Sequence, residues 1–145
     1  MKILQRFITK SESETALRAE EICKKIPAGS IVMFTGEMGA GKTAFVRGAL
    51  NAYQNSAHVS SPTFALVNDY GGTPHLYHFD MYRVNDENDL YSTGFFDYAD
   101  ENSILFIEWS ENILGALSDE KVIYVEIERI SDNERKITIS DGENA

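Results

Sequence analysis

Cysteine and long apolar runs are scarce in this sequence. Cys23 is the one cysteine among 145 residues, so no internal disulfide can form, which favours a reducing compartment. Its setting, Glu21–Lys25, is typical of an inert helical position. No apolar stretch approaches the ~20 residues that a membrane helix needs, and Met1–Phe7 lacks the apolar core of a signal peptide. We therefore expect a cytoplasmic protein without membrane contact.

Basic residues are also few. The chain has 13 Lys and Arg against 23 Asp and Glu, a net charge of −10, and shows no basic stripe. Proteins bind nucleic acid largely by neutralising phosphates with basic side chains, so direct nucleic-acid binding is disfavoured. An acidic protein can still act on nucleic acid through a partner. The length suits one domain spanning 1–145.

A glycine-rich segment is the strongest motif. Residues 36–43 read Gly-Glu-Met-Gly-Ala-Gly-Lys-Thr, which completes the pattern of Gly, four residues, Gly-Lys and Ser or Thr. The apolar run Ile31–Phe34 precedes it and the helical pattern Thr43–Leu50 follows. Strand, glycine loop and helix are the context that a phosphate-binding loop requires. The sequence thus predicts a nucleotide site.

Each part of this loop has an expected role. Glycines let backbone N–H groups approach the phosphates, and the start of the following helix adds positive potential. Lys42 is expected to reach the outer phosphates, and the Thr43 hydroxyl is expected to bind Mg²⁺. The expected nucleotide contacts are Glu37, Met38, Gly39, Ala40, Gly41, Lys42, Thr43 and Ala44.

Phosphoryl chemistry also needs carboxylates to hold magnesium and orient water. Glu108 directly follows the apolar run Ile104–Ile107, which predicts a carboxylate at the end of a buried central strand. Asp80 ends another predicted strand, where Leu76, His78 and Asp80 share one face. Asp80 is therefore either a second functional acid or part of a solvated strand face.

The pattern of the remaining chain predicts a P-loop α/β fold with three layers, a largely parallel central sheet and antiparallel hairpin additions. A strand is expected at 2–8, followed by a helix capped by Ser11 or Ser13, with Leu17, Ile22 and Ile26 on its apolar face, and ended by Pro27–Gly29. Hairpins are expected from 66–70 with 75–80 and from 121–130 with 135–140, and short helices within 86–101.

Several motifs that define other nucleotide-binding classes are missing. There is no Asn-Lys-x-Asp for guanine and no Leu-Ser-Gly-Gly-Gln of transporter ATPases. The scattered arginines form no lid of the kind that clamps a kinase's second substrate, and none is an obvious arginine finger. These absences predict slow intrinsic hydrolysis. A small-molecule kinase and a nucleotide-gated adaptor without turnover remain as alternatives.

Taken together, the motifs resemble the TsaE (YjeE) family of bacterial ATPases. The segments that carry the resemblance are Gly36–Thr43, Val59–Phe64 with Leu66-Val67 and Tyr70, His78–Arg83, Gly94 before Phe95–Tyr98, and Ile107–Ser110. Their order and spacing match from about Ser11 to Arg135. One departure is visible, because Glu37 stands where the family usually has Asp.

The resemblance implies a cytoplasmic, Mg²⁺-dependent ATPase that binds ATP and ADP and supports tRNA threonylcarbamoyladenosine formation beside the anticodon. It implies TsaB and TsaD as partners, with TsaD performing the transfer and with tRNA contacted through the partners. The free protein is expected to be a monomer.

The resemblance also implies roles for single residues. Thr43 and Glu108 would hold magnesium, while Asp80 would bind the metal or position water beside the catalytic Lys42. Ser61, Pro62 and Thr63, which by themselves read as a turn, would form a switch-like segment. Trp109 would support the nucleotide site or its partner face, and Thr15 with a residue near Ser131–Asn133 would border the adenine.

Overall fold

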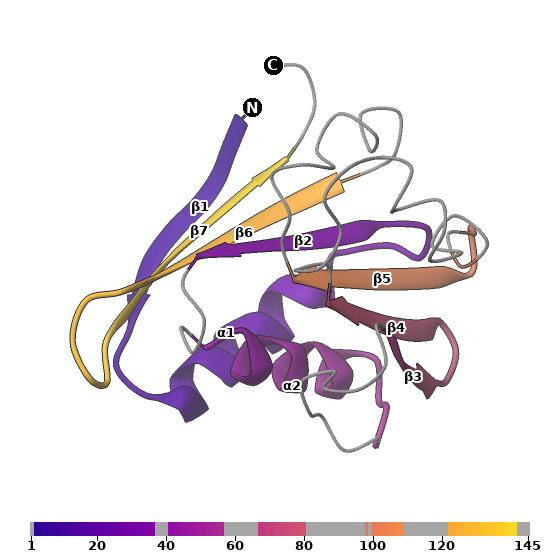
Figure 1. Cartoon of the computed structure of the whole chain (residues 1–145), viewed down its shortest axis with the longest axis horizontal. Helices are drawn as coiled ribbons and strands as arrows, with labels where there is room; N and C mark the ends of the chain where they lie inside the picture. The colour runs from indigo at the N-terminus through magenta and orange to yellow at the C-terminus, as the bar shows by residue number, and fades with distance from the viewer. Residues whose placement is uncertain are drawn as a thin grey trace.

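The computed structural model describes residues 2–36, 41–56, 67–80, 98, 100–108 and 122–141 (Figure 1). Its elements are β1 (Lys2–Thr9), α1 (Glu12–Cys23), β2 (Ile31–Gly36), α2 (Lys42–Ala52), β3 (Val67–Gly71), β4 (His75–Asp80), β5 (Ser103–Glu108), β6 (Val122–Arg129) and β7 (Arg135–Asp141). Among these residues, no helix is long and apolar enough to cross a membrane.

The strands form one seven-stranded sheet in the order β1-β7-β6-β2-β5-β4-β3. Its centre is parallel, since β2 pairs in parallel with both β5 and β6, and β5 pairs in parallel with β4. Antiparallel pairs extend both edges: β3 with β4 on one side, and β7 with β6 and β1 on the other. The predicted α/β class, with a parallel centre and hairpin additions, is confirmed.

Both described helices lie on the same face of the sheet (Figure 1). Beneath them, Phe34 meets Phe45 edge to face at 5.4 Å between ring centroids and stacks on Phe106 at 6.2 Å. The opposite face has its own apolar cluster, built around Met33, Phe79 and Ile107. The layer expected over that face lies outside the described residues, as does most of the segment 86–101, in which short helices were expected.

Helix α1 begins where the sequence predicts, but the residues that face the core are not all the predicted ones. The Ser11 side chain caps it by accepting a hydrogen bond from the Glu14 N–H at 3.0 Å. The predicted apolar face is only partly right: Ile22 packs against the core, but Leu17 is 62% exposed, and Ile26, although buried, lies beyond the last helical residue, Cys23. Small residues face the core instead, with Ala19 and Cys23 fully buried.

The reason is the close packing of α1 against α2. A Cβ placed on Gly48 of α2 would lie 2.0 Å from the Ala16 carbonyl oxygen and 2.9 Å from the Ala19 Cβ. At this distance only small side chains fit between the two helices, so large aliphatic residues are directed away from the contact.

Burial also raises the pKa of the Cys23 thiol to about 12, which keeps the thiol protonated and supports the interpretation of Cys23 as an inert packed residue.

Candidate functional site

The parallel strands β2, β5 and β6 end at the same edge of the sheet. Phe34 of β2 is in register with Glu108 of β5 and with Val125 of β6. The glycine loop therefore leaves β2 at the edge where β5 ends in Glu108. In parallel α/β sheets ligands bind outside the carboxyl ends of the strands, so this edge is the candidate site.

Helix α2 begins at this loop. Gly41 caps it with a φ of +109°, in the left-handed region that glycine adopts without steric penalty. Lys42, the first residue of α2, is 4% exposed, and lysine is rarely buried to this extent unless it is paired. The first turn of α2, which the structure describes, holds no acidic residue of its own, and the N–H groups there form the positive end of the helix dipole.

Glu108 lies within a chain of polar contacts that crosses three strands. Its Oε2 is 3.0 Å from Nε2 of His78 on β4. The other ring nitrogen of His78, Nδ1, is 3.1 Å from the hydroxyl of Tyr70 on β3. Glu108 is 8% exposed and His78 is fully buried. The sequence analysis assigned no role to His78. Its position on the same strand face as Asp80 was the signal that could have pointed to a role near the site.

A small pocket lies beside the start of α2. Its volume is about 120 Å³, and its lining residues are Ser11, Glu12, Thr15, Gly41, Ala44, Asp132, Asn133 and Arg135. The pocket thus joins the first turn of α1, the start of α2 and the β6–β7 hairpin. Thr15 is held there by a 2.6 Å hydrogen bond between its hydroxyl and that of Thr9. The structure brings Thr15 together with residues of the Ser131–Asn133 segment, as the sequence expectation requires.

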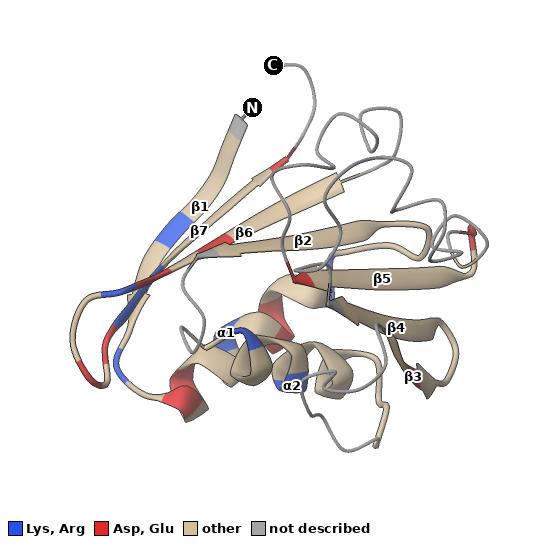
Figure 2. Cartoon of the chain, viewed as in Figure 1, with Lys and Arg blue, Asp and Glu red and all other residues tan. Residues whose placement is uncertain are grey.

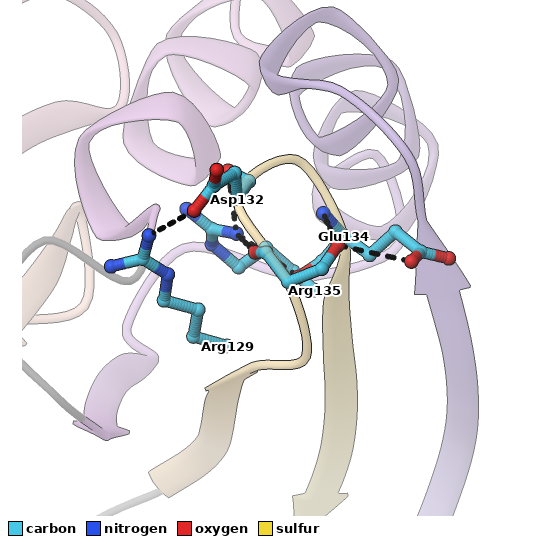
Figure 3. A network of polar contacts seen from close by, with 5 residues as sticks. Arg129, Asp132, Glu134 and Arg135 are labelled. Atoms are coloured by element: carbon cyan, nitrogen blue, oxygen red, sulfur yellow. Dashed lines mark hydrogen bonds and ion pairs between the residues drawn. The ribbon is translucent and has the colours of Figure 1, made fainter.

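The β6–β7 hairpin is ordered by its own side chains (Figure 3). Nη1 of Arg135 donates to the carbonyl oxygens of Ser131, Asp132 and Glu134 at 2.8, 3.3 and 3.0 Å. Arg129 pairs with the Asp132 carboxylate at 2.7 Å. Basic and acidic positions are interspersed along this hairpin (Figure 2). The Arg135 side chain comes within 4.0 Å of a Cβ built on Gly41, so the hairpin lies against the phosphate loop.

Other predicted site residues cannot be placed in this arrangement. Glu37–Ala40, Ser61–Thr63 and Trp109 lie outside the described residues. For Asp80 the backbone alone is described: it ends β4 in register with Glu108 of β5. The predicted roles of these residues remain predictions.

A parallel strand, a glycine-rich loop and a helix at the centre of an α/β sheet define the P-loop NTPase fold. The structure of YdiB from Bacillus subtilis has this fold too, with a TM-score of 0.73 and 25% sequence identity, covering 99% of this chain and 90% of that one.

Sequence comparisons specify the family. The family model of the threonylcarbamoyl adenosine biosynthesis protein TsaE matches residues 9–137. The tRNA threonylcarbamoyladenosine biosynthesis protein TsaE of Aquifex aeolicus is 37% identical over 145 residues, covering 96% of this chain and 98% of the relative. The Bacillus subtilis protein of the same name is 32% identical over 136 residues, covering 93% and 84%. The chain belongs to the TsaE family, which confirms the resemblance drawn from its motifs.

Proposed function

We propose that this chain is a cytoplasmic, magnesium-dependent ATPase that supports tRNA threonylcarbamoyladenosine formation. It would act with TsaB and TsaD, and TsaD would perform the transfer itself. The observation that carries the proposal is the buried Lys42 at the start of α2, on the loop that leaves the sheet edge where β5 ends in Glu108. A buried cation beside a helix N-terminus suits the phosphates of a nucleotide.

The residues at this edge fit a magnesium ion. The Thr43 hydroxyl and the Glu108 carboxylate are hard oxygen donors, and magnesium in nucleotide sites takes few protein ligands beside waters and phosphates. When bound, magnesium would neutralise charge on the outer phosphates. The protein's own contribution would be to hold the phosphates with Lys42 and the loop amides, and to orient water with Glu108 or Asp80.

The pocket bordered by Thr15, Gly41 and Asn133 supports a site for the adenine base of the nucleotide, because it adjoins the start of α2 on the side of the β6–β7 hairpin.

Arg135 is unsuited to act as an arginine finger, since its Nη1 donates to three carbonyl oxygens of the hairpin. Slow hydrolysis by the free protein and activation by partners are consistent with that arrangement. The net charge of −10 supports a role in which partners contact the tRNA.

The test is release of inorganic phosphate from ATP and Mg²⁺, by the protein alone and then with TsaB and TsaD of the same organism. We expect a slow basal rate that rises strongly with the pair. A rate indifferent to the pair would refute the partner-activated role. Phosphate appearing on a metabolite would instead favour the kinase alternative, and nucleotide binding without turnover in the full complex would favour the adaptor.

Replacing Lys42 tests the nucleotide site itself. Lys42→Ala is expected to abolish tight ATP binding in calorimetric titration, because it removes the one lysine of α2, which lies at the start of that helix. Lys24→Ala is the matched control, since Lys24 lies at the far end of α1 and its side chain is 61% exposed. Normal affinity in the Lys42 variant would contradict the proposed site.

A further inference from the structure

His78 is a buried polar side chain with two opposed partners. It lies on the helix-covered face of β4, in register with Phe106 of β5, and is fully buried. Leu76 precedes it on the same face and belongs to the apolar core there. Burying an imidazole in such an apolar layer destabilises the fold unless both ring nitrogens have polar partners. An aliphatic side chain would therefore be more stable at this position if packing were its only role.

The partners of His78 determine where its protons lie. Nε2 is 3.0 Å from a Glu108 carboxylate oxygen, so this nitrogen carries hydrogen whether the ring is neutral or charged. In the neutral ring Nδ1 accepts from the Tyr70 hydroxyl, 3.1 Å away. In that tautomer the Tyr70 hydroxyl donates to Nδ1, and the hydrogen of Nε2 lies on the side of the ring nearest the Glu108 carboxylate. Tyr70 thereby favours the tautomer that places hydrogen on Nε2.

The contact to Glu108 has a defined geometry. The carboxylate lies at ion-pair distance from Nε2 but off the line of the N–H, so Nε2 makes no linear hydrogen bond in this structure. The contact uses Oε2 of Glu108. Glu108 retains some exposure, with 11% of its side chain accessible against 0% for His78. The histidine thus holds the carboxylate from the core side and leaves it accessible at the sheet edge.

We propose that His78 is a positioning residue, with its ring oriented by Tyr70, that holds the Glu108 carboxylate in place for magnesium–nucleotide binding. A side chain that is already ordered loses less freedom when its ligand arrives, which is how outer-shell partners strengthen metal sites. The role given to Glu108 rests on the proposed function. The role given to His78 rests on its contacts with Glu108 and Tyr70.

The variants are chosen to separate the two nitrogens. His78→Leu removes both contacts and keeps an apolar side chain, while His78→Gln keeps an amide donor for Glu108. Tyr70→Phe removes the hydroxyl alone. His75→Leu is the matched control, because His75 lies on the same strand with its side chain 38% exposed. Circular dichroism and thermal melting establish that each variant folds.

The first readout uses the protein without nucleotide or metal. A double-mutant cycle of His78→Leu and Glu108→Gln in denaturant unfolding measures their coupling directly. We expect the two substitutions to be non-additive, with a coupling of about fivefold or more in the unfolding constant. His75→Leu combined with Glu108→Gln is expected to be additive. An additive His78–Glu108 cycle would overturn the proposal.

The second readout is the magnesium concentration at half-maximal nucleotide binding, followed by calorimetry. His78→Leu is expected to raise it by about tenfold or more, as loss of outer-shell partners typically does, while affinity without magnesium stays unchanged. His78→Gln should recover part of the shift, and Tyr70→Phe should cause a smaller shift in the same direction. An unchanged midpoint in a folded His78→Leu protein would overturn the proposal.

Two outcomes keep this proposal distinct from the proposed function. If His78→Leu fails to fold, His78→Gln and Tyr70→Phe decide it, and unchanged magnesium midpoints in both would overturn it. If the unmodified protein shows no magnesium-dependent nucleotide binding, the proposed function falls. The double-mutant cycle still reports whether His78 holds Glu108.

Discussion

Two pairs of polar side chains, each with one carboxylate, lie at the loop-bearing edge of the sheet in opposite environments. The pair between His78 and Glu108 is almost closed to solvent, with side-chain exposures of 0% and 11%. The pair between Arg129 and Asp132 is open, with exposures of 51% and 91%. The buried pair ends β5 beside the phosphate-loop strand, and the exposed pair belongs to the β6–β7 hairpin.

The difference shows how the two regions use charge. Burying a carboxylate and an imidazole sacrifices their hydration, so their contact contributes little net stability, and its effect is to fix where the carboxylate lies. An exposed pair retains most of its hydration and adds little stability by itself. The hairpin is ordered mainly by Arg135, whose contacts are to backbone carbonyls. The comparison predicts large effects for changes in the interior and small ones for changes in the hairpin.

The largest effect is expected in the interior, at the contact between α1 and α2. Gly48→Ala would place a Cβ 2.0 Å from the Ala16 carbonyl oxygen, which a helix can relieve only by moving. Although alanine favours helix by about 1 kcal/mol, we expect a net loss of roughly 2–4 kcal/mol in the free energy of unfolding. Denaturant unfolding measures it, with exposed Asn51→Ala as the control in the same helix. Unchanged stability would show that the helices are not packed this closely.

A smaller loss is expected for the buried hydroxyl pair. Thr15→Val keeps the shape of the side chain but leaves the buried Thr9 hydroxyl without its 2.6 Å partner. An unsatisfied buried hydroxyl costs about 1–3 kcal/mol, which thermal or denaturant unfolding resolves. Ser131→Ala removes an exposed hydroxyl that bonds Glu134 and is the matched control. Equal losses in the two variants would remove the distinction between the interior and the hairpin.

A local effect is expected at Arg135. Lysine cannot reproduce the planar guanidinium that reaches three carbonyls, so Arg135→Lys is expected to loosen the hairpin at a cost of about 1 kcal/mol. Hydrogen exchange is the measurement. The amide of Ile130, which donates to the Glu134 carbonyl at 3.0 Å, should exchange several-fold faster, while the amides of β2 should not change. Unaltered exchange at Ile130 would mean that the backbone turn alone holds the hairpin.

The smallest effect is expected for the exposed pair. Arg129→Ala should change the free energy of unfolding by less than about 1 kcal/mol, because water and salt screen the interaction with Asp132. The change should diminish further between low and high salt, and denaturant unfolding at two ionic strengths checks this. A loss of several kcal/mol that is independent of salt would contradict the comparison of the two regions.

Many secondary-structure elements and the fold class were determined by local sequence. The helix that follows the glycine-rich segment, the buried strand that ends in Glu108 and both hairpins follow from glycine spacing, apolar runs and turn residues, which act within a few positions of one another. The same local signals placed Glu108 at a strand end. They also predicted the α/β class, because a strand, a glycine loop and a helix at the chain's centre leave few arrangements.

Only the tertiary structure decided which distant residues meet. Thr15 and Asn133 line one pocket because β1 and β7 pair at one side of the sheet, and His78 lies next to Glu108 because β4 lies beside β5. Leu17 was misassigned because the buried face of α1 depends on how closely Gly48 lets α2 approach. Strand order and helix separation are set by packing between segments far apart in the chain, so local periodicity does not predict them.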